Sequence, residues 1–280
     1  MNQLKADYQV QELAQALEVS PSGFYAHQQK PQGLRARQDQ KLVEQIKSIF
    51  QASRCTYGSP RIRAVLRRQG ERCGKNRIAR LMREQQLLAR HKRRFVPRTT
   101  RSDHDQPVAP NRLGQLPAPV RPNQVWVADI TYLPSEEGWI YLAVILDACS
   151  RKVVGWSAGL SLETSLVTEA LERARQSRRP PPGLLHHSDR GIQYASSAYR
   201  ALLGKYQIIP SMSRLANPYD NALAESFMAT LKNDCWTNLP PTRAQAKFKV
   251  FDYIETFYNP KRLHSALGYQ SPVEFENQFN

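Results

Sequence analysis

Apolar residues recur every three to four positions over the first part of the chain, which is the spacing of helices that bury one face. Residues 9–18 predict one short helix, and Ser20-Pro21 predicts the start of a second, because Ser suits an N-cap and Pro the first helical position. This pair predicts a helix-turn-helix-like region within residues 1–53, although any helical hairpin has the same pattern. Helical spacing continues from Leu42 to the end of that region.

A second helical pair is predicted over residues 54–96. Ser59-Pro60 repeats the N-cap and first-turn arrangement, and Gly70 ends that helix. Residues 75–88 form another amphipathic pattern, with Ile78, Leu81 and Met82 inside and Lys75, Arg77, Arg80 and Arg83 on the other faces. The pair predicts a second, more basic helix-turn-helix-like region that contacts DNA, and a purely structural three-helix module is the alternative.

Prolines and the absence of large apolar clusters over residues 97–122 predict a semi-rigid linker. Beyond it the spacing changes to the alternation typical of strands. Strands are predicted over residues 124–134, 139–148, 152–159, 184–189 and 207–213, and helices over 162–178, 196–206, 220–233 (with Asp220 as N-cap) and 242–258. A hairpin meander followed by alternating strands and helices predicts an α/β domain with a mixed sheet over residues 123–280, and Trp126, Trp139 and Trp156 are expected in its core.

The composition is that of a globular protein, because 41% of the 280 residues are hydrophobic. The longest apolar runs, such as residues 140–146, are too short to cross a bilayer, and the first twenty residues do not resemble a secretion signal. Four widely spaced cysteines without a CxxC pair predict free thiols in a reducing compartment.

Positive charge is concentrated in one part of the chain. The net charge is +16, and residues 51–100 carry 15 Lys and Arg against two Asp and Glu, including the basic arm at residues 90–98. Such a block attracts the phosphates of nucleic acid and predicts a DNA-binding protein. A solvated basic face and an anionic membrane surface are the alternatives, and the second is disfavoured because the segment lacks an exposed apolar face.

Three acidic residues are candidates for a metal-dependent site. Asp129 interrupts an apolar strand, Asp189 follows the strand 184–189, and Glu225 lies on the helix 220–233, separated from Asp189 by 35 residues. Two or three convergent carboxylates suffice for Mg²⁺, the cation of phosphoryl transfer. Each acid also has a non-catalytic alternative: Asp129 as a surface acid of an edge strand, Asp189 as an ordinary turn residue, and Glu225 as a solvent-exposed helix residue. Asp147, at the end of the second strand, is a further candidate metal ligand. His186 and His187 are expected at a strand end rather than on a metal.

These residues and the sequence around them resemble a known family. The order and spacing of the three acids resemble the DDE catalytic core of retroviral integrases and related transposases. The segments WVADITY, LDACSRKVVGW, HHSDRGIQYAS, SMSRLANPYDNALAES, LKND, YNPKRLHSALGYQSP and YGSPRIRAVLRRQG…NRIARLMREQQLLAR are similar to the OrfB proteins of insertion sequences that encode two overlapping frames, OrfA and OrfB. The resemblance covers roughly residues 10–275.

The resemblance implies a ribonuclease-H-like fold, with a five-stranded mixed sheet and flanking helices after the all-α region, and a catalytic core with a C-terminal helical extension over residues 123–280. It implies a DNA transposase of the DDE type that nicks element ends and transfers a freed 3′-hydroxyl. Asp129, Asp189 and Glu225 would be catalytic and would bind two Mg²⁺ or Mn²⁺ ions. Lys232 would contact terminal DNA, and Asn221, His187 and Arg190 would shape the pocket. The charge pattern adds Arg77, Arg80, Arg83, Lys92, Arg93 and Arg94 as DNA contacts.

The sequence departs from the family pattern in two places, and it lacks the zinc-ligand residues of retroviral integrases. Ala128 stands where a small polar residue usually precedes the first Asp, and Leu215-Ala216 replace the usual glycine before Asn217. The first sixty residues contain one histidine, His27, and one cysteine, Cys55. No zinc module of the retroviral integrase type is therefore expected. The partners expected are double-stranded DNA, further copies of the chain and an OrfA protein or fusion, in the bacterial cytoplasm at the nucleoid and not at a membrane. Three functions remain open: a transposase, a DNA-binding regulator or accessory OrfB subunit without catalysis of its own, and a structure-selective nuclease.

Overall fold

Five strands form one mixed sheet in the C-terminal half of the chain. The computed structural model describes residues 8–29, 33–89, 106–214 and 218–279. The strands are β1 (Val125–Ser135), β2 (Gly138–Asp147), β3 (Val153–Gly159), β4 (Leu185–Ser188) and β5 (Ile209–Met212), in the spatial order β3-β2-β1-β4-β5. The first three pair antiparallel, whereas β4 pairs parallel with β1 and β5 parallel with β4. The predicted α/β class with a mixed five-stranded sheet is confirmed.

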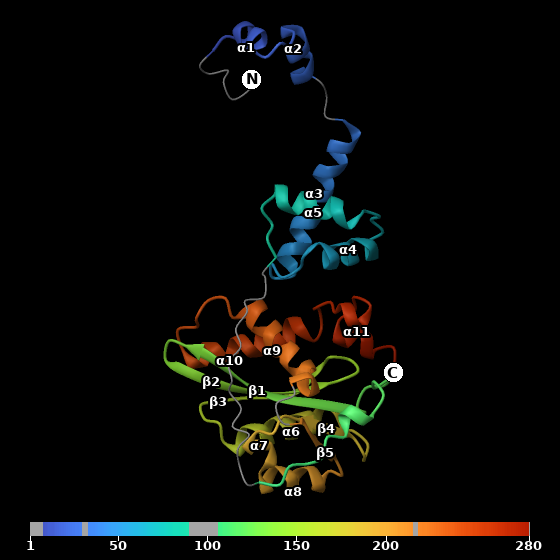
Figure 1. The fold of residues 1–280 in the computed structure, drawn as a ribbon, viewed down its shortest axis with the longest axis vertical. Coiled ribbons are helices and arrows are strands. Elements are labelled where there is room, and N and C mark those ends of the chain that lie inside the picture. Colours follow the sequence, from blue (N-terminus) through green and yellow to red (C-terminus); the bar gives the residue numbers. More distant parts are fainter. Residues whose placement is uncertain (1–7, 30–32, 90–105, 215–217, 280) are drawn as a thin grey trace.

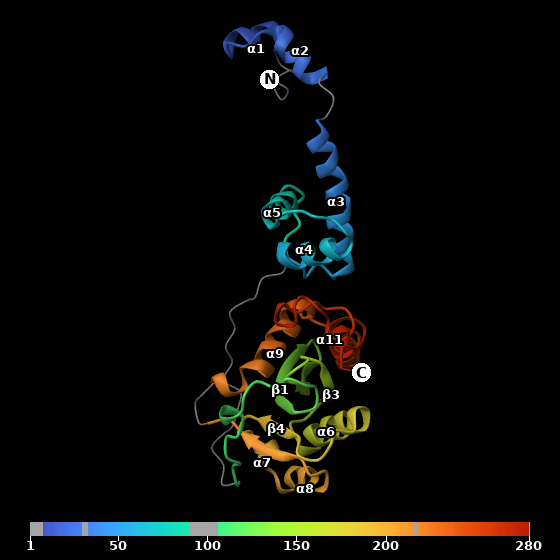
Figure 2. The ribbon, with the colours of Figure 1, turned by 90° about the vertical axis from the view of Figure 1, so that its right-hand side faces the viewer.

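Helices cover both faces of this sheet (Figures 1 and 2). One face packs against α6 (Thr164–Arg178), α7 (Ile192–Ala195) and α8 (Ser197–Lys205), and the other against α9 (Ala222–Cys235) and α10 (Arg243–Phe251). The alternation of β1 assigns its side chains to these two layers, with Trp126 and Ala128 facing α6 and α8 and Val125 and Val127 facing α9. Asp129 belongs to the second set, so the alternation directs it toward α9.

The N-terminal half is helical. It contains α1 (Val10–Ala16), α2 (Pro21–Gln29), α3 (Leu34–Ala52), α4 (Ser59–Arg68) and α5 (Lys75–Glu84). Apolar residues of α3, α4 and α5 form a shared core, including Ile46, Ile62 and Ile78, each almost fully buried. We call α3–α5 the helical module. The domain boundary expected between residues 53 and 54 falls just after α3, which packs on the two helices that follow it; the division itself stays a prediction.

The helical module contacts the C-terminal segment of the chain. The hydroxyl of Tyr57 donates to the carbonyl of Lys261 (3.1 Å) and accepts from the backbone N–H of Leu263 (2.7 Å). Arg61 donates to the carbonyl of Leu263 (2.9 Å). Arg68 forms an ion pair with Glu274 (3.1 Å) in α11 (Pro272–Glu276). Part of the positive charge in residues 51–100 is therefore engaged within the protein.

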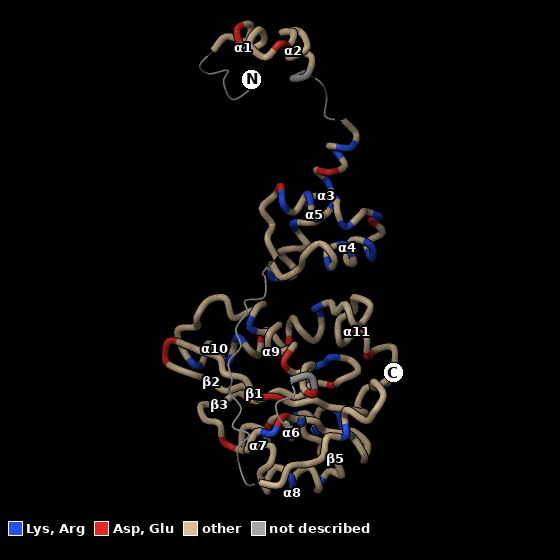
Figure 3. Tube along the Cα trace, viewed as in Figure 1, with Lys and Arg blue, Asp and Glu red and all other residues tan. Residues whose placement is uncertain are grey.

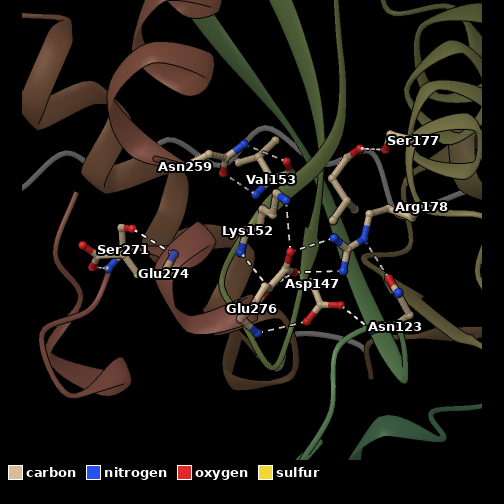
Figure 4. A network of polar contacts seen from close by, with 12 residues as sticks. Asn123, Asp147, Lys152, Val153, Ser177, Arg178, Asn259, Ser271, Glu274 and Glu276 are labelled. Atoms are coloured by element: carbon tan, nitrogen blue, oxygen red, sulfur yellow. Dashed lines mark hydrogen bonds and ion pairs between the residues drawn. The ribbon is translucent and has the colours of Figure 1, made fainter. Parts of the chain in front are cut away.

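A buried carboxylate fixes α11 against the sheet (Figure 4). Glu276 pairs with Arg178 of α6 (2.7 Å) and Lys152 (3.0 Å) and accepts from the hydroxyl of Ser150 (2.7 Å). Asp147 lies beside it and accepts backbone N–H groups of Asn123, Cys149 and Ser150, which anchor the turn after β2. Sequence patterning did not predict α11 or this network, because its residues come from four separate segments.

Several local predictions are corrected. Asp220 is not an N-cap of α9; it lies in the short 3-10 segment η2 (Pro218–Asn221) and is engaged by Arg214 (3.0 Å), while Asn221 occupies the N-cap position. The predicted helix 242–258 divides into α10 and the π-helical segment η3 (Asp252–Tyr258). Trp126 is buried and Trp156 half-buried, but Trp139 is 52% exposed, so its expected place in the core was wrong. All four cysteines are free, as predicted. In the described part of the chain, no helix is long and apolar enough to cross a membrane.

Candidate active site

Asp129 lies in the middle of β1, opposite Val144 of β2. Its Oδ1 accepts the backbone N–H of Ile130 (2.9 Å), and its side chain is half-buried. Burial and the nearby carboxylate of Asp189 raise the pKa of Asp129 well above its ordinary value. A mid-strand acid held in this way is costly unless something at the site compensates its charge.

Asp189 follows β4 directly and begins the turn to α7. Its Oδ1 accepts the backbone N–H of Gly191 (3.0 Å), and a Cβ at position 191 would meet that same oxygen at 3.1 Å. The glycine therefore allows the turn to close tightly on the carboxylate. Because β4 runs parallel to β1, with Val127 opposite His187, Asp189 emerges beside the strand that carries Asp129.

Glu225 lies in the first turn of α9 and is exposed. Partial desolvation raises its pKa, and the charge of Asp189 raises it further. Lys232 lies two turns later on the same helix, as the spacing predicts, and is half-buried. Burial lowers the pKa of Lys232, while the carboxylate of Asp129 opposes that shift. The three predicted acids and the predicted lysine thus lie close enough together for their charges to shift one another's pKa values.

Asn221 connects α9 to β1. Its Nδ2 donates to the carbonyl of Ala128 (3.1 Å), the residue before Asp129, and its buried Oδ1 has no hydrogen-bond partner among the described residues. A buried acceptor without a donor costs free energy, and such a group calls for an explanation such as a missing water or ion. The hydrogen bond to Ala128 joins the start of α9 to the residue before Asp129.

The donor chemistry of this neighbourhood fits a hard divalent cation. Carboxylate oxygens are the ligands that Mg²⁺ and Mn²⁺ prefer, and a cation would offset the burial and the neighbouring negative charge that raise the pKa values of Asp129 and Glu225. Among the described residues, however, no group of three His, Cys, Asp or Glu side chains is already close enough to hold a metal ion. The metal-ligand roles of the three acids therefore stay predictions.

The two histidines before Asp189 are buried in the sheet. Burial lowers the pKa of His187 to about 4, and its ring nitrogens lie 2.8 Å and 3.2 Å from the hydroxyls of Ser211 and Ser213. Burial lowers the pKa of His186 to about 3, and its Nε2 lies 3.0 Å from the Tyr199 hydroxyl. Both rings are therefore neutral near pH 7 and cross-link β4 to its neighbours. This agrees with the strand-end interpretation.

Arg190 and Asp147, two further residues considered from the sequence, are held by backbone groups. Arg190 donates its Nε–H to the carbonyl of Ser213 (2.8 Å), which ties the Asp189 turn to the chain after β5. Asp147 is fully buried and accepts the backbone N–H groups of Asn123, Cys149 and Ser150. That environment makes Asp147 a structural acid at the turn after β2.

The predicted DNA-binding residues fall into three groups. Arg77 and Arg80 of α5 both pair with Asp39 of α3 (2.6 Å each), and Arg80 also pairs with Glu84 (2.7 Å). Arg83 is exposed on the same helix. Lys92, Arg93 and Arg94 lie outside the described residues. Figure 3 shows lysine and arginine gathered on the helical module, whereas both signs mix over the sheet domain. The DNA contacts of all these residues stay predictions.

Two tyrosines near the acids were not predicted as site residues. Tyr194 of α7 is buried, and within the described ranges its hydroxyl finds no hydrogen-bond partner. It lines, with Ser188, Tyr199 and Met212, a pocket of about 230 Å³ that residues 107–110 also line. Tyr132 lies on β1 three residues after Asp129. Neither tyrosine stood out as a site residue in the sequence, and the tertiary structure places Tyr194, from the helix after Asp189, near the acids.

Comparison with family models divides the chain into three matched segments. An integrase core domain model matches residues 119–218, and a second integrase core domain model matches residues 206–272. A model of an HTH-like domain matches residues 37–95, which contain most of the helical module.

Curated relatives match nearly the full length. The chain is 42% identical over 269 residues to an insertion element IS600 31 kDa protein of Shigella sonnei, covering 96% of this chain and 98% of the relative. It is 38% identical to the transposase InsF for insertion sequence IS3A of Escherichia coli, covering 98% and 96%. It is 41% identical to the transposase for insertion sequence element IS904 of Lactococcus lactis, covering 84% and 93%. Among solved structures, an HTLV-2 integrase catalytic core domain in complex with magnesium is 20% identical, with a TM-score of 0.44, covering 56% of this chain and 98% of that one.

Proposed function

This chain belongs to the insertion-sequence transposases that carry an integrase core domain, and we propose from that membership how its residues act on DNA. The chain is a DNA transposase of the DDE type, a polynucleotidyl transferase. The observation that carries the assignment of residues is how three elements converge: β4, which Asp189 follows, pairs parallel with β1, and Asn221 at the start of α9 donates to Ala128 of β1. This arrangement supports one acidic site built from Asp129, Asp189 and Glu225.

Two successive displacements at phosphorus account for the reaction. In the first, a water oxygen attacks the phosphate at the element end, the bond from phosphorus to the 3′-oxygen breaks, and a 3′-hydroxyl and a 5′-phosphate result. In the second, that 3′-hydroxyl attacks a phosphodiester of the receiving strand, and a new 3′ to 5′ linkage forms as the old 3′-oxygen leaves. Neither displacement requires a covalent bond to the protein, so no nucleophilic side chain is needed.

Asp129, Asp189 and Glu225 are proposed to hold the divalent cations, Mg²⁺ or Mn²⁺, as two ions per site. Bound ions of this kind supply charge stabilisation for the attacking and leaving oxygens. Asn221 fixes the start of α9 against β1 through Ala128 and thereby orients Glu225 toward the aspartates. Lys232 offers a cation to a terminal DNA phosphate from the same helix face, and Arg190 and His187 hold the turn that carries Asp189.

The partners proposed are double-stranded DNA and further copies of this chain. The HTH-like domain and the charge of the helical module support binding to element ends. Because two ends must be joined, at least a dimer on DNA is expected. An OrfA protein, supplied separately or as a fusion, is a further proposed partner, and the bacterial cytoplasm at the nucleoid is the proposed location.

A cleavage and joining assay tests these roles. The substrate is a labelled duplex that carries the terminal repeats flanking the gene, incubated with the full chain and Mg²⁺ or Mn²⁺. We expect nicked and joined products with the wild type and background levels with Glu225→Gln and with Asp189→Asn. Glu163→Gln, at the N-cap of α6, is the matched control and keeps full activity.

Band-shift binding and the melting temperature, measured on the same variants, separate loss of chemistry from loss of folding. Activity retained in Glu225→Gln would contradict the assignment of the triad. Specific binding by a folded wild type without any product would instead favour an accessory OrfB subunit, and nicking without joining would favour a nuclease.

A further inference from the structure

Part of the predicted linker is anchored along the edge of the sheet. Residues 107–110 line a pocket together with residues 210–212 of β5, which is the last strand of the sheet. Ala109 packs against the apolar cluster that contains α8, whereas Leu113 packs against the cluster that contains α9. The segment therefore passes across the sheet edge from one helical layer to the other. We call residues 107–113 the strap.

Backbone groups of the strap bind Ser211 of β5. The N–H groups of Arg112 and Leu113 donate to the Ser211 hydroxyl oxygen (2.9 Å and 3.3 Å). The same oxygen lies 2.8 Å from Nδ1 of His187. A hydroxyl has two lone pairs and one proton, so with both lone pairs engaged it donates its proton to the imidazole. These bonds use no side chain of the strap, and they therefore survive the replacement of a strap side chain.

The side chain of Asn111 connects the strap to the segment that begins α9. Its Nδ2 donates to Oδ2 of Asp220 in η2 (2.7 Å). The same carboxylate accepts the backbone N–H of Arg214 (2.8 Å) and two of its guanidinium N–H groups (3.1 Å and 3.0 Å). Four donors, from the strap and from the chain after β5, thus converge on one carboxylate whose side chain is 7% exposed.

This environment makes Asp220 an acceptor of fixed geometry. The Arg214 guanidinium lowers the pKa of Asp220 to about 2, so the carboxylate is ionised near pH 7. Hydrogen bonds to an ionised acceptor are shorter and stronger than those between neutral groups. Loss of the Asn111 donor should therefore have a larger effect than loss of a hydrogen bond between neutral groups.

Asp220 is joined directly to the helix that carries Glu225. The next residue, Asn221, occupies the N-cap position of α9 and donates to the carbonyl of Ala128 in β1, and Glu225 lies in the first turn. The start of α9 is therefore attached at two successive residues, one to β1 and the other to the strap and the chain after β5. Two attachments restrict the rotation that a single attachment would allow, and they thereby set the direction of Glu225.

We propose that Asn111 and Asp220 are positioning residues for Glu225: the contact between them holds the first turn of α9 in the direction that the acidic site requires. This inference rests on the proposed function, because that function assigns Glu225 its role. Asn111 lies before residues 119–218, the segment that matches an integrase core domain model. The acidic site therefore depends on a residue of the predicted linker.

Single-turnover cleavage by the full chain tests this role, with Mg²⁺ and a duplex that carries the terminal repeats. Asn111→Ala removes the donor to Asp220 and leaves the Arg214 pair and the backbone bonds to Ser211 in place. We expect the rate at saturating DNA to fall about tenfold, the value of one hydrogen bond to a charged group. The DNA concentration for half the maximal rate and the melting temperature should not change. Gln115→Ala, an exposed residue just after the strap, is the matched control and should change none of these values.

An exchange of the two side chains separates positioning from a general loss of structure. Asn111→Asp puts a second carboxylate beside Asp220, and the repulsion should lower the rate further than Asn111→Ala does. Combining it with Asp220→Asn again gives one amide donor and one carboxylate acceptor at the contact. The combined variant should therefore be faster than Asn111→Asp alone, although each substitution by itself lowers the rate.

Two further measurements do not require cleavage. Hydrogen exchange reports the backbone amides of residues 225–229, which bond to the first carbonyls of α9. These amides should exchange faster in Asn111→Ala than in the wild type or in Gln115→Ala. Binding of Mn²⁺ alone to the full chain, followed by electron paramagnetic resonance, should weaken about tenfold in Asn111→Ala, because the residues behind a metal ligand fix its orientation.

Wild-type cleavage and wild-type exchange in Asn111→Ala overturn the proposal. So does a combined variant that is no faster than Asn111→Asp, because the two side chains would then act separately. If the wild type neither cleaves DNA nor binds Mn²⁺ but the exchange of α9 depends on Asn111, the contact positions the helix and the catalytic assignment fails. If cleavage depends on Glu225 and no measurement depends on Asn111, the positioning fails and the catalytic assignment stands.

Discussion

Arg54 and Asp252 are 198 residues apart in the chain and form a two-point ion pair, with distances of 2.6 Å and 3.1 Å. Arg54 also donates to the hydroxyl of Thr256 (2.7 Å) and lies over the ring of Phe257. The pair joins the turn after α3 to η3. It extends the contacts of Tyr57 and Arg61 and fixes the helical module against the C-terminal segment.

The same C-terminal segment continues to the helix that carries Glu225. Arg262 pairs with Asp234 of α9 (2.6 Å), and both side chains are almost completely buried. Tyr253 donates to the same carboxylate (2.8 Å). Contacts therefore connect the turn after α3 with α9 through η3 and the residues that follow it.

Loss of the Arg54–Asp252 pair should loosen the helical module. Both side chains are more than one-third exposed, so a double-mutant cycle of Arg54→Ala and Asp252→Ala should give a coupling of about 0.5–1 kcal/mol in urea unfolding. Proteolysis within the linker should also quicken. Arg63→Ala, an exposed arginine on α4, is the control and should change neither measurement. A coupling near zero would show that packing alone holds the module.

The helical module should bind DNA through the arginines that other side chains leave available. Within the described residues, Arg63 and Arg67 of α4 and Arg83 of α5 are exposed and form no ion pair. Replacing all three with Ala should make the slope of log affinity against log salt shallower by roughly two to three. Fluorescence anisotropy over a salt series measures this slope.

Arg77→Ala is the informative comparison, because Arg77 is engaged by Asp39. We expect a lower melting temperature and a change in slope of less than about one. If Arg77→Ala flattens the slope as much as the triple variant does, the Asp39 pair opens when DNA binds.

Glu276 should stabilise the fold at neutral pH and lose this effect in acid. Burial alone would raise the pKa of Glu276, but hydrogen bonds from Arg178, Ser150 and Lys152 hold it below its ordinary value. The unfolded chain then binds more protons than the folded chain, so the contribution is complete above about pH 4.5 and fades as the pH falls through the folded-state pKa. Glu276→Gln should cost about 2 kcal/mol at pH 7. The difference from wild type should shrink below pH 4, and a gap that stays constant in denaturant titrations would refute this linkage.

His264 should make the fold sensitive to mild acid. Burial, and then the positive charges of Arg262, Arg61 and Arg151, lower the pKa of His264 to about 3. An unfolded histidine titrates near pH 6.5, so between these values the unfolded chain binds the extra proton and stability falls as the pH falls. The loss from this group between pH 7 and pH 5 is about 2 kcal/mol. His264→Gln should remove that part of the slope in urea unfolding, and an unchanged slope would assign the effect to other groups, such as His186.

The sequence alone predicted most of the helices and strands and proposed the residues of the acidic site. Strand alternation around Asp129 requires only neighbouring residues, as does the helical spacing that puts Glu225 and Lys232 on one face. The resemblance to a known family then predicted the reaction, DDE-type transposition. It could do so because several motifs in a fixed order around Asp189 and Glu225 are more specific than either acid alone. The roles of these residues are still predictions.

Only the tertiary structure decided which charges and rings remain available to a partner. Arg54, Arg61 and Arg68 belong by sequence to a DNA-binding block, yet their partners lie about 200 residues away in the chain. Trp139 was expected in the core because its strand is apolar, but its exposure depends on where β3 and β4 end. The local sequence pattern indicates on which face of a helix or strand a side chain lies. Its burial and its ion-pair partners depend on segments that come together only in the folded chain.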